Sequence, residues 1–388
     1  MNQLLTPQQD LFSLPTDLTY LNCAYMAPLL KTVEAAGISG MQKKRLPTDY
    51  GPYEFFEEVA QARKLFAKLV HITDFQRIVI LPAVSYGMAI VAKNLKIQAG
   101  DNVIVVGEQF PSSVYPWHRR VREAKAELRT VVAPSGTENR GQRWNERLLE
   151  AIDNQTCMVA IPHTHWSDGT RFDLMAVRQR TREVGALLVV DGTQSVGALP
   201  FHVTDIQPDA LICAGYKWLM GPYGLTLGYF GEFFDEGKPL EEGWIARYES
   251  EDFTKLVNYQ DQYQPKALRY DMGERSNFIL IPMMGKALEA VLDWQPERVQ
   301  AYCQSITTSA ITKLRELGCW VEDDVQRGQH LFGVRLPEHI RMENVQEALK
   351  RAKISVSVRG DSIRVSPHLY NKESDMERLL ICLQQAMA

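Results

Sequence analysis

The feature that most constrains this chain is a regular alternation of short apolar runs and longer helical stretches up to residue 230. Each apolar run is compact, rich in β-branched residues and bounded by turn residues, which is typical of a strand buried on both faces. Strands that alternate with crossover helices predict a mostly parallel sheet with helices on both faces. The runs are 77–82, 102–107, 157–163, 186–192, 210–215 and 226–230.

Apolar residues at helical spacing predict amphipathic helices between these runs and in the C-terminal part. From about residue 279 the pattern changes to long helical stretches with few strands, which predicts a second, α+β domain. The predicted helices are 52–70, 84–96, 113–126, 174–185, 281–294, 296–317, 343–352 and 375–387.

Composition argues against several classes of protein. The chain has 388 residues, of which 45% are hydrophobic and 23% charged, as in an average soluble protein with two lobes. A net charge of −4 gives no reason to expect a nucleic-acid partner. No apolar stretch approaches the ~20 residues that cross a bilayer, and the N-terminus lacks the features of a signal peptide. Six scattered cysteines, without a CxxC pair or Cys/His cluster, predict reduced thiols, a cytoplasmic location and no metal site.

Polar residues follow two of the predicted strands at the point where each strand ends. The run 186–192 reaches Asp191, and the run 210–215 is followed by Tyr216, Lys217 and a Gly-Pro-rich turn. Ligands of parallel α/β sheets bind at the carboxyl ends of the strands, so we expect the carboxylate and the amine to face one crevice. A lysine that follows a buried strand between two aromatic residues is poorly placed for a solubility role.

This pair of residue types is the one that pyridoxal-5′-phosphate (PLP) chemistry requires. A lysine amine condenses with the cofactor aldehyde, and a lowered pKa lets it act as nucleophile and later as base. A carboxylate keeps the pyridine nitrogen protonated, so that the ring accepts electrons from a substrate carbanion. The sequence therefore predicts PLP held as a Schiff base on Lys217, with Asp191 at the pyridine nitrogen. No G-x-G-x-x-G fingerprint occurs, which disfavours NAD chemistry.

The stretches VDGTQSVG at 190–197 and AGYKW at 214–218, with GPYG at 221–224, resemble the class V aminotransferase family. That family also contains cysteine desulfurases, kynureninases and isopenicillin-epimerase-like proteins, and the resemblance runs from YLNCAYMAP near residue 20 to IRVSPHLYN near residue 370. It implies the type I PLP-dependent transferase fold, with a mostly parallel seven-stranded sheet in a large domain and a smaller α+β C-terminal domain. It also implies a homodimer whose site lies near the interface. The expected divisions are an N-terminal segment 1–20 that packs with the small domain, a large PLP-binding domain 21–275 and a small domain 276–388.

The resemblance implies roles for individual residues around the cofactor ring. Lys217 matches the Schiff-base lysine, Asp191 the partner of the pyridine nitrogen, and Gln194 the side chain near the phenolic oxygen. Tyr216 matches a position whose side chain can reach the phosphate. Phe110, in QFPSSVYPW, matches the kynureninase-like version of the residue that stacks on the ring, where desulfurases usually have histidine. A core phenylalanine is the alternative for Phe110.

The turn PAVSYG at 82–87 is similar to the phosphate cradle of this family. A helix N-terminus presents unpaired N–H groups and a positive dipole end to an anion, so the Val84 N–H and the Ser85 N–H and hydroxyl are candidates. An ordinary N-cap is the alternative for Ser85. Trp166 falls where many relatives place an asparagine beside the cofactor, which suggests a bulkier, more apolar substrate pocket.

Three further positions are carried over from the family for substrate and phosphate binding. Arg364 matches the arginine that binds the substrate α-carboxylate with two parallel donors, and a strand-edge salt bridge is its alternative. Tyr25 lies in the N-terminal segment that enters the pocket and is expected to face substrate. Arg275 replaces a threonine that reaches the partner subunit's phosphate in relatives, or else it pairs with a neighbouring acid such as Glu274. The segment 231–275 lacks periodicity and is expected to form a long structured loop over the site.

The absence of a cysteine from one stretch of the sequence reduces the number of reactions that we expect. Cysteine desulfurases need a nucleophilic cysteine shortly before the carboxylate-binding arginine, and the stretch 356–363 contains none, so we expect that the chain is not a cysteine desulfurase. The expected function is PLP-dependent chemistry at the amino group and α-carbon of an amino acid, with transamination as the default reaction of the family. A kynureninase-like β-lyase, an epimerase and a PLP-binding regulatory protein are the alternatives.

Overall fold

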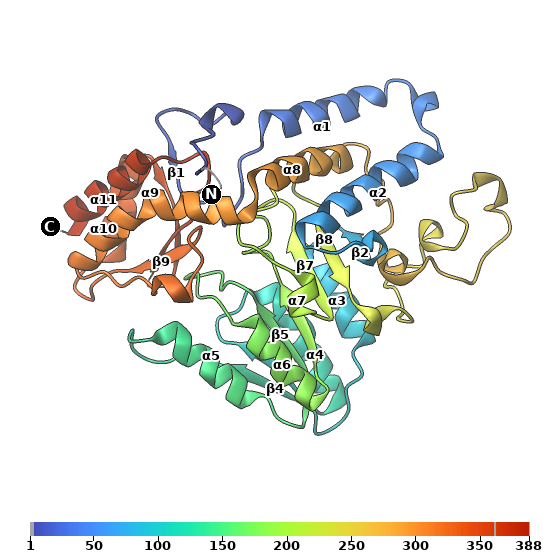
Figure 1. Ribbon diagram of the computed structural model, residues 1–388, viewed down its shortest axis with the longest axis horizontal. Helices are drawn as coiled ribbons and strands as arrows, with labels where there is room; N and C mark the ends of the chain where they lie inside the picture. Colours follow the sequence, from blue (N-terminus) through green and yellow to red (C-terminus); the bar gives the residue numbers. More distant parts are fainter. Residues whose placement is uncertain (1–3, 361, 388) are drawn as a thin grey trace.

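The computed structural model describes residues 4–360 and 362–387, and a seven-stranded sheet forms its centre (Figure 1). The strand order is β2-β8-β7-β6-β5-β3-β4. All pairs from β7 to β4 are parallel, whereas β8 runs antiparallel to both β7 and β2. The expectation of a mostly parallel seven-stranded sheet is therefore confirmed. The strands are β2 (Ile78–Leu81), β3 (Asn102–Val106), β4 (Glu127–Val131), β5 (Thr156–Pro162), β6 (Leu187–Asp191), β7 (Ala210–Ala214) and β8 (Thr226–Phe230).

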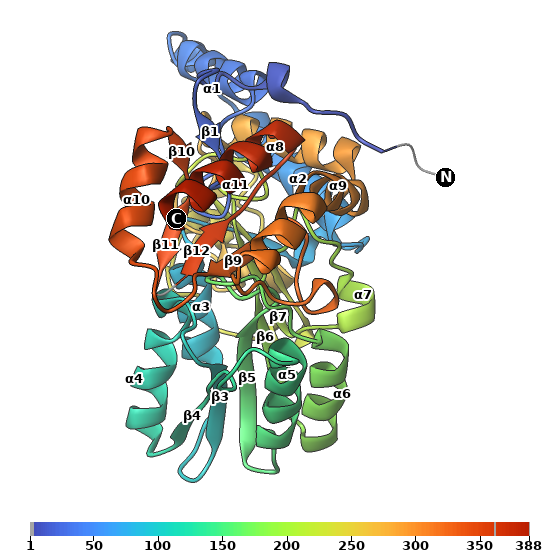
Figure 2. The ribbon, with the colours of Figure 1, turned by 90° about the vertical axis from the view of Figure 1, so that its left-hand side faces the viewer.

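The strands of the sheet contribute to two hydrophobic cores, because successive side chains point to opposite faces of the sheet. In β2, Ile78 and Ile80 belong to one core and Val79 and Leu81 to the other. Helices α2, α5, α6, α7 and α8 cover the first face, and α3 and α4 cover the second, as Figure 2 shows for α3 to α6. These helices are α2 (Pro52–Leu69), α3 (Val84–Asn94), α4 (Tyr115–Ala124), α5 (Arg140–Ala151), α6 (Leu174–Val184), α7 (Val203–Ile206) and α8 (Leu280–Trp294).

The C-terminal part packs around a small antiparallel sheet of order β11-β12-β9. Helices α9, α10 and α11 enclose a third core with this sheet, and the N-terminal strand β1 pairs in parallel with β10. The division at residues 275 and 276 stays a prediction. Within the part of the chain that the structure describes, no helix is both long and apolar enough to cross a membrane. The helices and strands of the C-terminal part, together with the N-terminal strand, are β1 (Thr19–Tyr20), α9 (Pro296–Glu316), β9 (Phe332–Arg335), α10 (Met342–Arg351), β10 (Ile354–Ser355), β11 (Ser357–Arg359), β12 (Ser362–Val365) and α11 (Glu373–Met387).

Every helix and strand that the sequence predicted is present, but β4, α5, the short elements β1 and α7, and the helix α1 (Lys31–Lys43) were missed. Strand β4 lies at the edge of the sheet and is half-exposed, so its polar residues hide the usual apolar run. Helix α1 contains Gly37 and Gly40, which lower helix propensity. Both glycines are buried against the region of α8, where a larger side chain would clash with Met283 or with the Phe278 carbonyl. Tertiary packing therefore overrides propensity in α1.

Candidate functional site

A cavity of about 280 Å³ lies at the carboxyl ends of β5, β6 and β7, beside the N-terminus of α3. This is the edge of the sheet at which the sequence placed the acid and the amine. The structure brings most of the predicted cofactor residues to this one cavity. Those that line it are Val84, Ser85, Phe110, Trp166, Asp191, Gln194, Tyr216 and Lys217.

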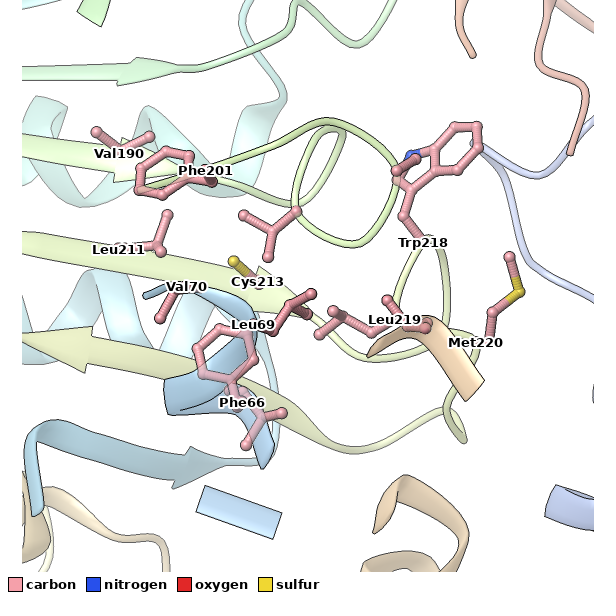
Figure 3. Close-up of a cluster of buried hydrophobic side chains, with 14 of the residues drawn as sticks. Phe66, Leu69, Val70, Val190, Phe201, Leu211, Cys213, Trp218, Leu219 and Met220 are labelled. Carbon is pink, nitrogen blue, oxygen red and sulfur yellow. The ribbon is translucent and has the colours of Figure 1, made fainter. Parts of the chain in front are cut away.

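Lys217 is held at the cavity by the buried loop that follows β7. Trp218, Leu219 and Met220 are buried in the core that packs against the end of α2 (Figure 3). Gly215 permits the turn, because a Cβ at this position would lie 2.6 Å from the Leu225 carbonyl oxygen. The rigid loop therefore fixes where the lysine side chain begins.

Lys217 is only 8% exposed, and its Nζ lies 5.7 Å from the centre of the Phe110 ring and 5.6 Å from that of Tyr216. Burial, followed by the positive charge of Arg364, lowers the pKa of the Lys217 ammonium to about 8, although Asp191 acts in the opposite direction. A substantial fraction of the amine is therefore neutral near physiological pH. That is the state in which a lysine acts as nucleophile or base.

Asp191 is the last residue of β6, and its carboxylate is fixed by two hydrogen bonds. Ser113 Oγ donates to Asp191 Oδ2 (2.8 Å), and the Thr193 backbone N–H donates to Oδ1 (3.0 Å). These bonds orient a buried carboxylate at the cavity wall without neutralising its charge. Sequence reasoning missed Ser113, although the serine pair in QFPSSV was a visible signal.

Gln194 lies three residues after Asp191. Both the oxygen and the nitrogen of its side-chain amide make hydrogen bonds within the protein. Trp218 Nε1 donates to Gln194 Oε1 (2.9 Å), and Gln194 Nε2 donates to the Ala24 carbonyl (3.1 Å). One N–H of the amide remains for a group in the cavity. The bond to Ala24 also ties the N-terminal segment to the site.

The N-terminus of α3 forms one wall of the cavity. Its N-cap residue, Ala83, is extended and makes no side-chain hydrogen bond, so the first N–H groups of the helix stay available for an anion. Ser85 is exposed and lines the cavity with Val84. Thr164, a buried residue that also lines the cavity, has a hydroxyl with no hydrogen-bond partner in the described structure, and sequence reasoning missed it.

Two aromatic rings also line the cavity. Phe110 and Trp166 meet edge to face with their centroids 5.6 Å apart, and Phe110 is 42% exposed. Trp166 Nε1 donates to the Glu108 carbonyl (2.6 Å), so the indole N–H is used by the backbone. The exposure of Phe110 argues against the alternative of a core phenylalanine.

Arg364 lies on β12, next to the cavity but not in its lining. Its Nη1 donates to the Trp166 carbonyl (2.9 Å) and its Nη2 to Ser357 Oγ (3.4 Å), while the buried Nε has no partner. Burial, and then the charge of Arg359, lower its pKa to about 9, which still leaves it charged at neutral pH. No acid pairs with Arg364 among the described residues, so the structure does not support the alternative of a strand-edge salt bridge.

Arg359 is a second guanidinium at the site that sequence reasoning missed. It lies 5.2 Å from the centre of the Trp166 ring. Ser357 pairs with Arg364 across the β11–β12 hairpin, and Arg359 is two residues from Ser357, so both arginines occupy the same face of the sheet. The alternation of side chains in VSVRGDSIR was the signal that could have found it. Two cations therefore lie near Lys217 with Asp191 as the opposing charge.

Two predicted residues lie away from the cavity. Tyr25 is 56% exposed and lines a neighbouring open groove together with Arg359. Arg275 is buried and pairs through Nε with Asp271 Oδ2 (3.3 Å) rather than with Glu274. Its role toward a partner subunit's phosphate stays a prediction.

The segment 231–275 was expected to lie over the site. This expectation is wrong, because in the single chain the segment lies away from the cavity. It contains short 3₁₀ helices and no strand. None of its residues lines the cavity. Part of the segment packs instead along the edge of β2 that does not pair with β8, where the Met272 N–H donates to the Ile80 carbonyl (3.0 Å). Aromatic and acidic composition alone did not reveal where the segment would dock.

Comparison with known proteins identifies the class. Residues 52–379 match the family model described as Aminotransferase class-V, and the chain belongs to this family. The uncharacterized aminotransferase YcbU of Bacillus subtilis is 26% identical over 328 residues, covering 84% of this chain and 83% of the relative. A cysteine desulfurase of Escherichia coli O139:H28 is 28% identical over 265 residues, covering 67% of this chain and 63% of the relative.

Solved structures agree with the fold. The cysteine desulfurase CsdA of Escherichia coli superimposes with a TM-score of 0.81 at 19% identity and 97% coverage of both chains. A mutant of C-DES, with glycine covalently linked to its PLP cofactor, gives a TM-score of 0.82 at 18% identity, covering 97% of this chain and 98% of C-DES. The expected PLP-dependent transferase fold is confirmed, and so is PLP as the cofactor at the level of the family.

The sequence led us to exclude cysteine desulfurase activity, and the comparisons contradict this exclusion. Cysteine desulfurases occur among both the sequence relatives and the structural neighbours. The exclusion considered only the stretch 356–363, whereas the fold brings Cys23 close enough to Lys217 and Arg364 for their charges to influence it. Cys23 is fully buried, and burial raises the pKa of its thiol to about 12. Cys23 lies in the N-terminal segment NCAYMAP, which the resemblance already places near the pocket, but the exclusion gave this cysteine no role.

Proposed function

We propose that the chain is a PLP-dependent enzyme that acts on the amino group and α-carbon of an amino acid, and that its reaction is transamination. The observation that carries the proposal is Lys217, buried in a cavity with a lowered pKa, opposite the oriented carboxylate of Asp191. Perturbed groups that converge in one cavity are typical of catalytic sites. Membership of the class V aminotransferases supports transamination as the first reaction to test.

The residues present fit the cofactor. The N–H groups at Val84 and Ser85 suit its phosphate, the Asp191 carboxylate suits a protonated pyridine nitrogen, and Phe110 offers an exposed ring face for stacking. Gln194 has one free N–H for the phenolic oxygen, and Tyr216 lines the same cavity. When bound, PLP supplies a sink for the electrons that remain on the α-carbon after a proton leaves.

Residues of the chain itself would transfer the proton and bind the substrate. Lys217 has the burial and the pKa to take the α-proton and to return it at another carbon. Arg364 has a buried Nε without a partner and no pairing acid among the described residues, so it can hold the α-carboxylate of the substrate. Arg359 and Tyr25 lie at the neighbouring groove, where a substrate side chain would extend.

We also propose a homodimer with the site near the interface, acting in the cytoplasm on a small amino-acid substrate. The implied approach of Arg275 to the partner subunit's phosphate belongs to this proposal. The six cysteines are all unpaired in the structure, which supports a reducing compartment. A PLP-binding regulatory role is disfavoured, because Lys217, Asp191 and Arg364 are all present and arranged for chemistry.

Loss of a substituent from the β-carbon is a second candidate reaction, and Cys23 is the observation that favours it. The charge of Lys217 acts on the Cys23 thiol, and cysteine desulfurases occur among the relatives. The sequence QFPSSV around Phe110 also keeps a kynureninase-like lyase within this candidate group. An epimerase, which inverts the α-carbon and keeps the β-substituent, is a separate alternative. Both possibilities use the same lysine and arginine.

Product analysis separates these reactions. The purified holoenzyme is incubated with a panel of amino acids, with and without a keto-acid acceptor, while the cofactor absorption band is followed. A new amino acid formed only when the acceptor is present supports transamination. Alanine from kynurenine, or alanine from cysteine with its sulfur left as a protein persulfide that an added thiol reductant releases as sulfide, in the absence of an acceptor would replace it with the second candidate. A cofactor band that no amino acid changes would refute the proposed function.

The lowered pKa of Lys217 predicts how cofactor capture depends on pH. Only the neutral amine attacks an aldehyde, and its fraction rises about tenfold per pH unit below the pKa. The rate at which the apoprotein forms its adduct with PLP should therefore rise up to about pH 8 and then level off, whereas a lysine at its usual value of 10.5 would show a continued rise. Absorbance kinetics between pH 6 and pH 10 check this, and a rate that keeps rising to pH 10 contradicts it.

Arg364→Lys is predicted to weaken recognition of the substrate carboxylate. A lysine keeps the charge but loses the two parallel donors, so kcat/KM for amino acids should fall about 10- to 100-fold, mostly through KM. The rate with an amine that lacks the carboxylate should not change. Arg359→Lys is the matched control on the same hairpin. A larger loss in this control than in Arg364→Lys would assign the carboxylate to Arg359 instead.

A further inference from the structure

A group of three potential metal ligands lies outside the cavity. It consists of His71, His202 and Glu297, and one ligand atom from each lies within 4.8 Å of the others. His71 follows α2, His202 directly precedes α7, and Glu297 lies in the first turn of α9. Because the three residues are far apart in the sequence, no local spacing marks them. The sequence prediction of no metal site depended on such spacing.

Buried contacts fix the three segments relative to one another. The Val203 N–H donates to the Val70 carbonyl (3.0 Å), which joins the two histidine-bearing segments. Gln300 Nε2 donates to the Ala198 carbonyl (2.7 Å), which joins α9 to the segment before α7. Figure 3 shows Val70 and Phe201, each adjacent in sequence to one histidine, in the same buried cluster. The backbone of the group is therefore preorganised, as a metal site requires.

His202 is already oriented as a metal ligand. Its Nδ1 lies 3.2 Å from Asp205 Oδ2, while its Nε2 is buried and has no hydrogen-bond partner in the described structure. A carboxylate at one ring nitrogen holds the proton there and leaves the lone pair of the other nitrogen free, which is the usual arrangement of metal-binding histidines.

Ring stacking alone does not account for this arrangement. The His71 and His202 rings are in contact, with their centroids 4.0 Å apart and their planes at 41°. That contact buries ring surface, but it leaves the Nε2 of His202 without a partner, which is unfavourable for a buried polar atom. A bound cation would satisfy this atom and would also use the carboxylate of Glu297.

We propose that His71, His202 and Glu297 bind a Zn²⁺ ion, with Asp205 orienting His202. Two imidazoles and a carboxylate form a donor set suited to zinc, whereas Mg²⁺ and Ca²⁺ prefer oxygen ligands. Zinc–nitrogen bonds of about 2.0–2.1 Å require the ligand atoms to approach more closely, and the exposed side chains of His71 and Glu297 can rotate to do so. Water would complete the coordination.

A bound ion would join the end of α2, the start of α7 and the start of α9. It would therefore tie helices that cover the central sheet to the long helix that leads into the C-terminal core. Because it would bind the folded chain and not the unfolded one, zinc should raise the thermal midpoint of unfolding. This site does not depend on the proposed PLP chemistry.

Calorimetric titration tests the site directly. Holoenzyme is treated with EDTA, dialysed free of chelator and unbound PLP, and titrated with ZnCl₂. The wild type should bind one equivalent and unfold at a higher temperature with Zn²⁺ but not with Mg²⁺. His202→Ala should weaken binding more than tenfold, and Asp205→Asn by about 10- to 100-fold. His118→Ala, an exposed histidine on α4, is the matched control and should bind as the wild type does.

Two outcomes would overturn the proposal. The first is a wild-type protein that shows neither a heat of binding nor a thermal shift with zinc. The second is zinc binding of unchanged affinity in both His202→Ala and Glu297→Gln, since the ion would then lie elsewhere. Glu297→Gln replaces an exposed side chain and keeps its shape, so it guards against a loss of binding caused by misfolding.

Discussion

Replacement of Lys217 by alanine is expected to abolish the borohydride-reducible adduct between protein and PLP and to lower kcat by at least about 10³-fold. The variant loses both the amine that condenses with the cofactor and the base that handles the α-proton. No other lysine among the described residues lines the cavity, so no neighbouring amine there can take over either role. Mass spectrometry after reduction, together with turnover of the best amino-acid substrate, measures the two losses separately.

Lys44→Ala is the matched control, because Lys44 is an exposed lysine at the end of α1. It should keep the adduct and full turnover. A small external amine should restore part of the activity of Lys217→Ala, since it can carry the proton that the side chain no longer carries. A reducible adduct of wild-type yield in Lys217→Ala would show that another residue holds the cofactor.

The second large effect is expected for Asp191→Asn, with a fall in kcat of about 10²- to 10³-fold. The amide oxygen can still accept the hydrogen bond from the Thr193 N–H, and the amide NH2 can donate to the Ser113 hydroxyl, so the geometry of the site should persist. It cannot balance a positive charge on the pyridine nitrogen, and the ring would therefore accept electrons less readily. Steady-state kinetics and the cofactor absorption spectrum measure the loss.

A cofactor analogue methylated on the pyridine nitrogen provides the control for Asp191→Asn. Its charge is permanent, so it should recover much of the activity in the variant while giving no gain in the wild type. Failure of the analogue in the variant, with PLP still bound, would mean that Asp191 acts through something other than the charge of the ring. Wild-type turnover of Asp191→Asn with ordinary PLP would exclude the assigned role altogether.

The core of the candidate site could be predicted because its signals are local. Asp191 ends one apolar run and Lys217 follows another, and parallel strands bring their carboxyl ends to the same edge. The strands other than β4 could be predicted from the sequence because they are buried on both faces of the sheet and are therefore almost wholly apolar. The edge strand β4 lacks that signal, since water reaches much of its surface.

The partners that tune these residues could not be predicted in the same way. Ser113 is distant in sequence from Asp191, and Arg359 is distant from Lys217, so only the packing of separate segments brings them near. Cys23 was expected near the pocket, but its role was left open. The exclusion of desulfurase chemistry failed for this reason. It depended on the place of a cysteine along the chain, whereas reactivity depends on its place in space.

The sequence alone therefore determined the class of this protein, the strands of its central sheet other than β4, and the acid–amine pair of its cavity, because strand burial and strand ends leave local patterns. The tertiary structure decided the pKa of Lys217, the neighbours of Arg364 and the grouping of His71 with His202 and Glu297. Desolvation and charge act through space and fall off with distance. The distances that govern them exist only once the chain has packed.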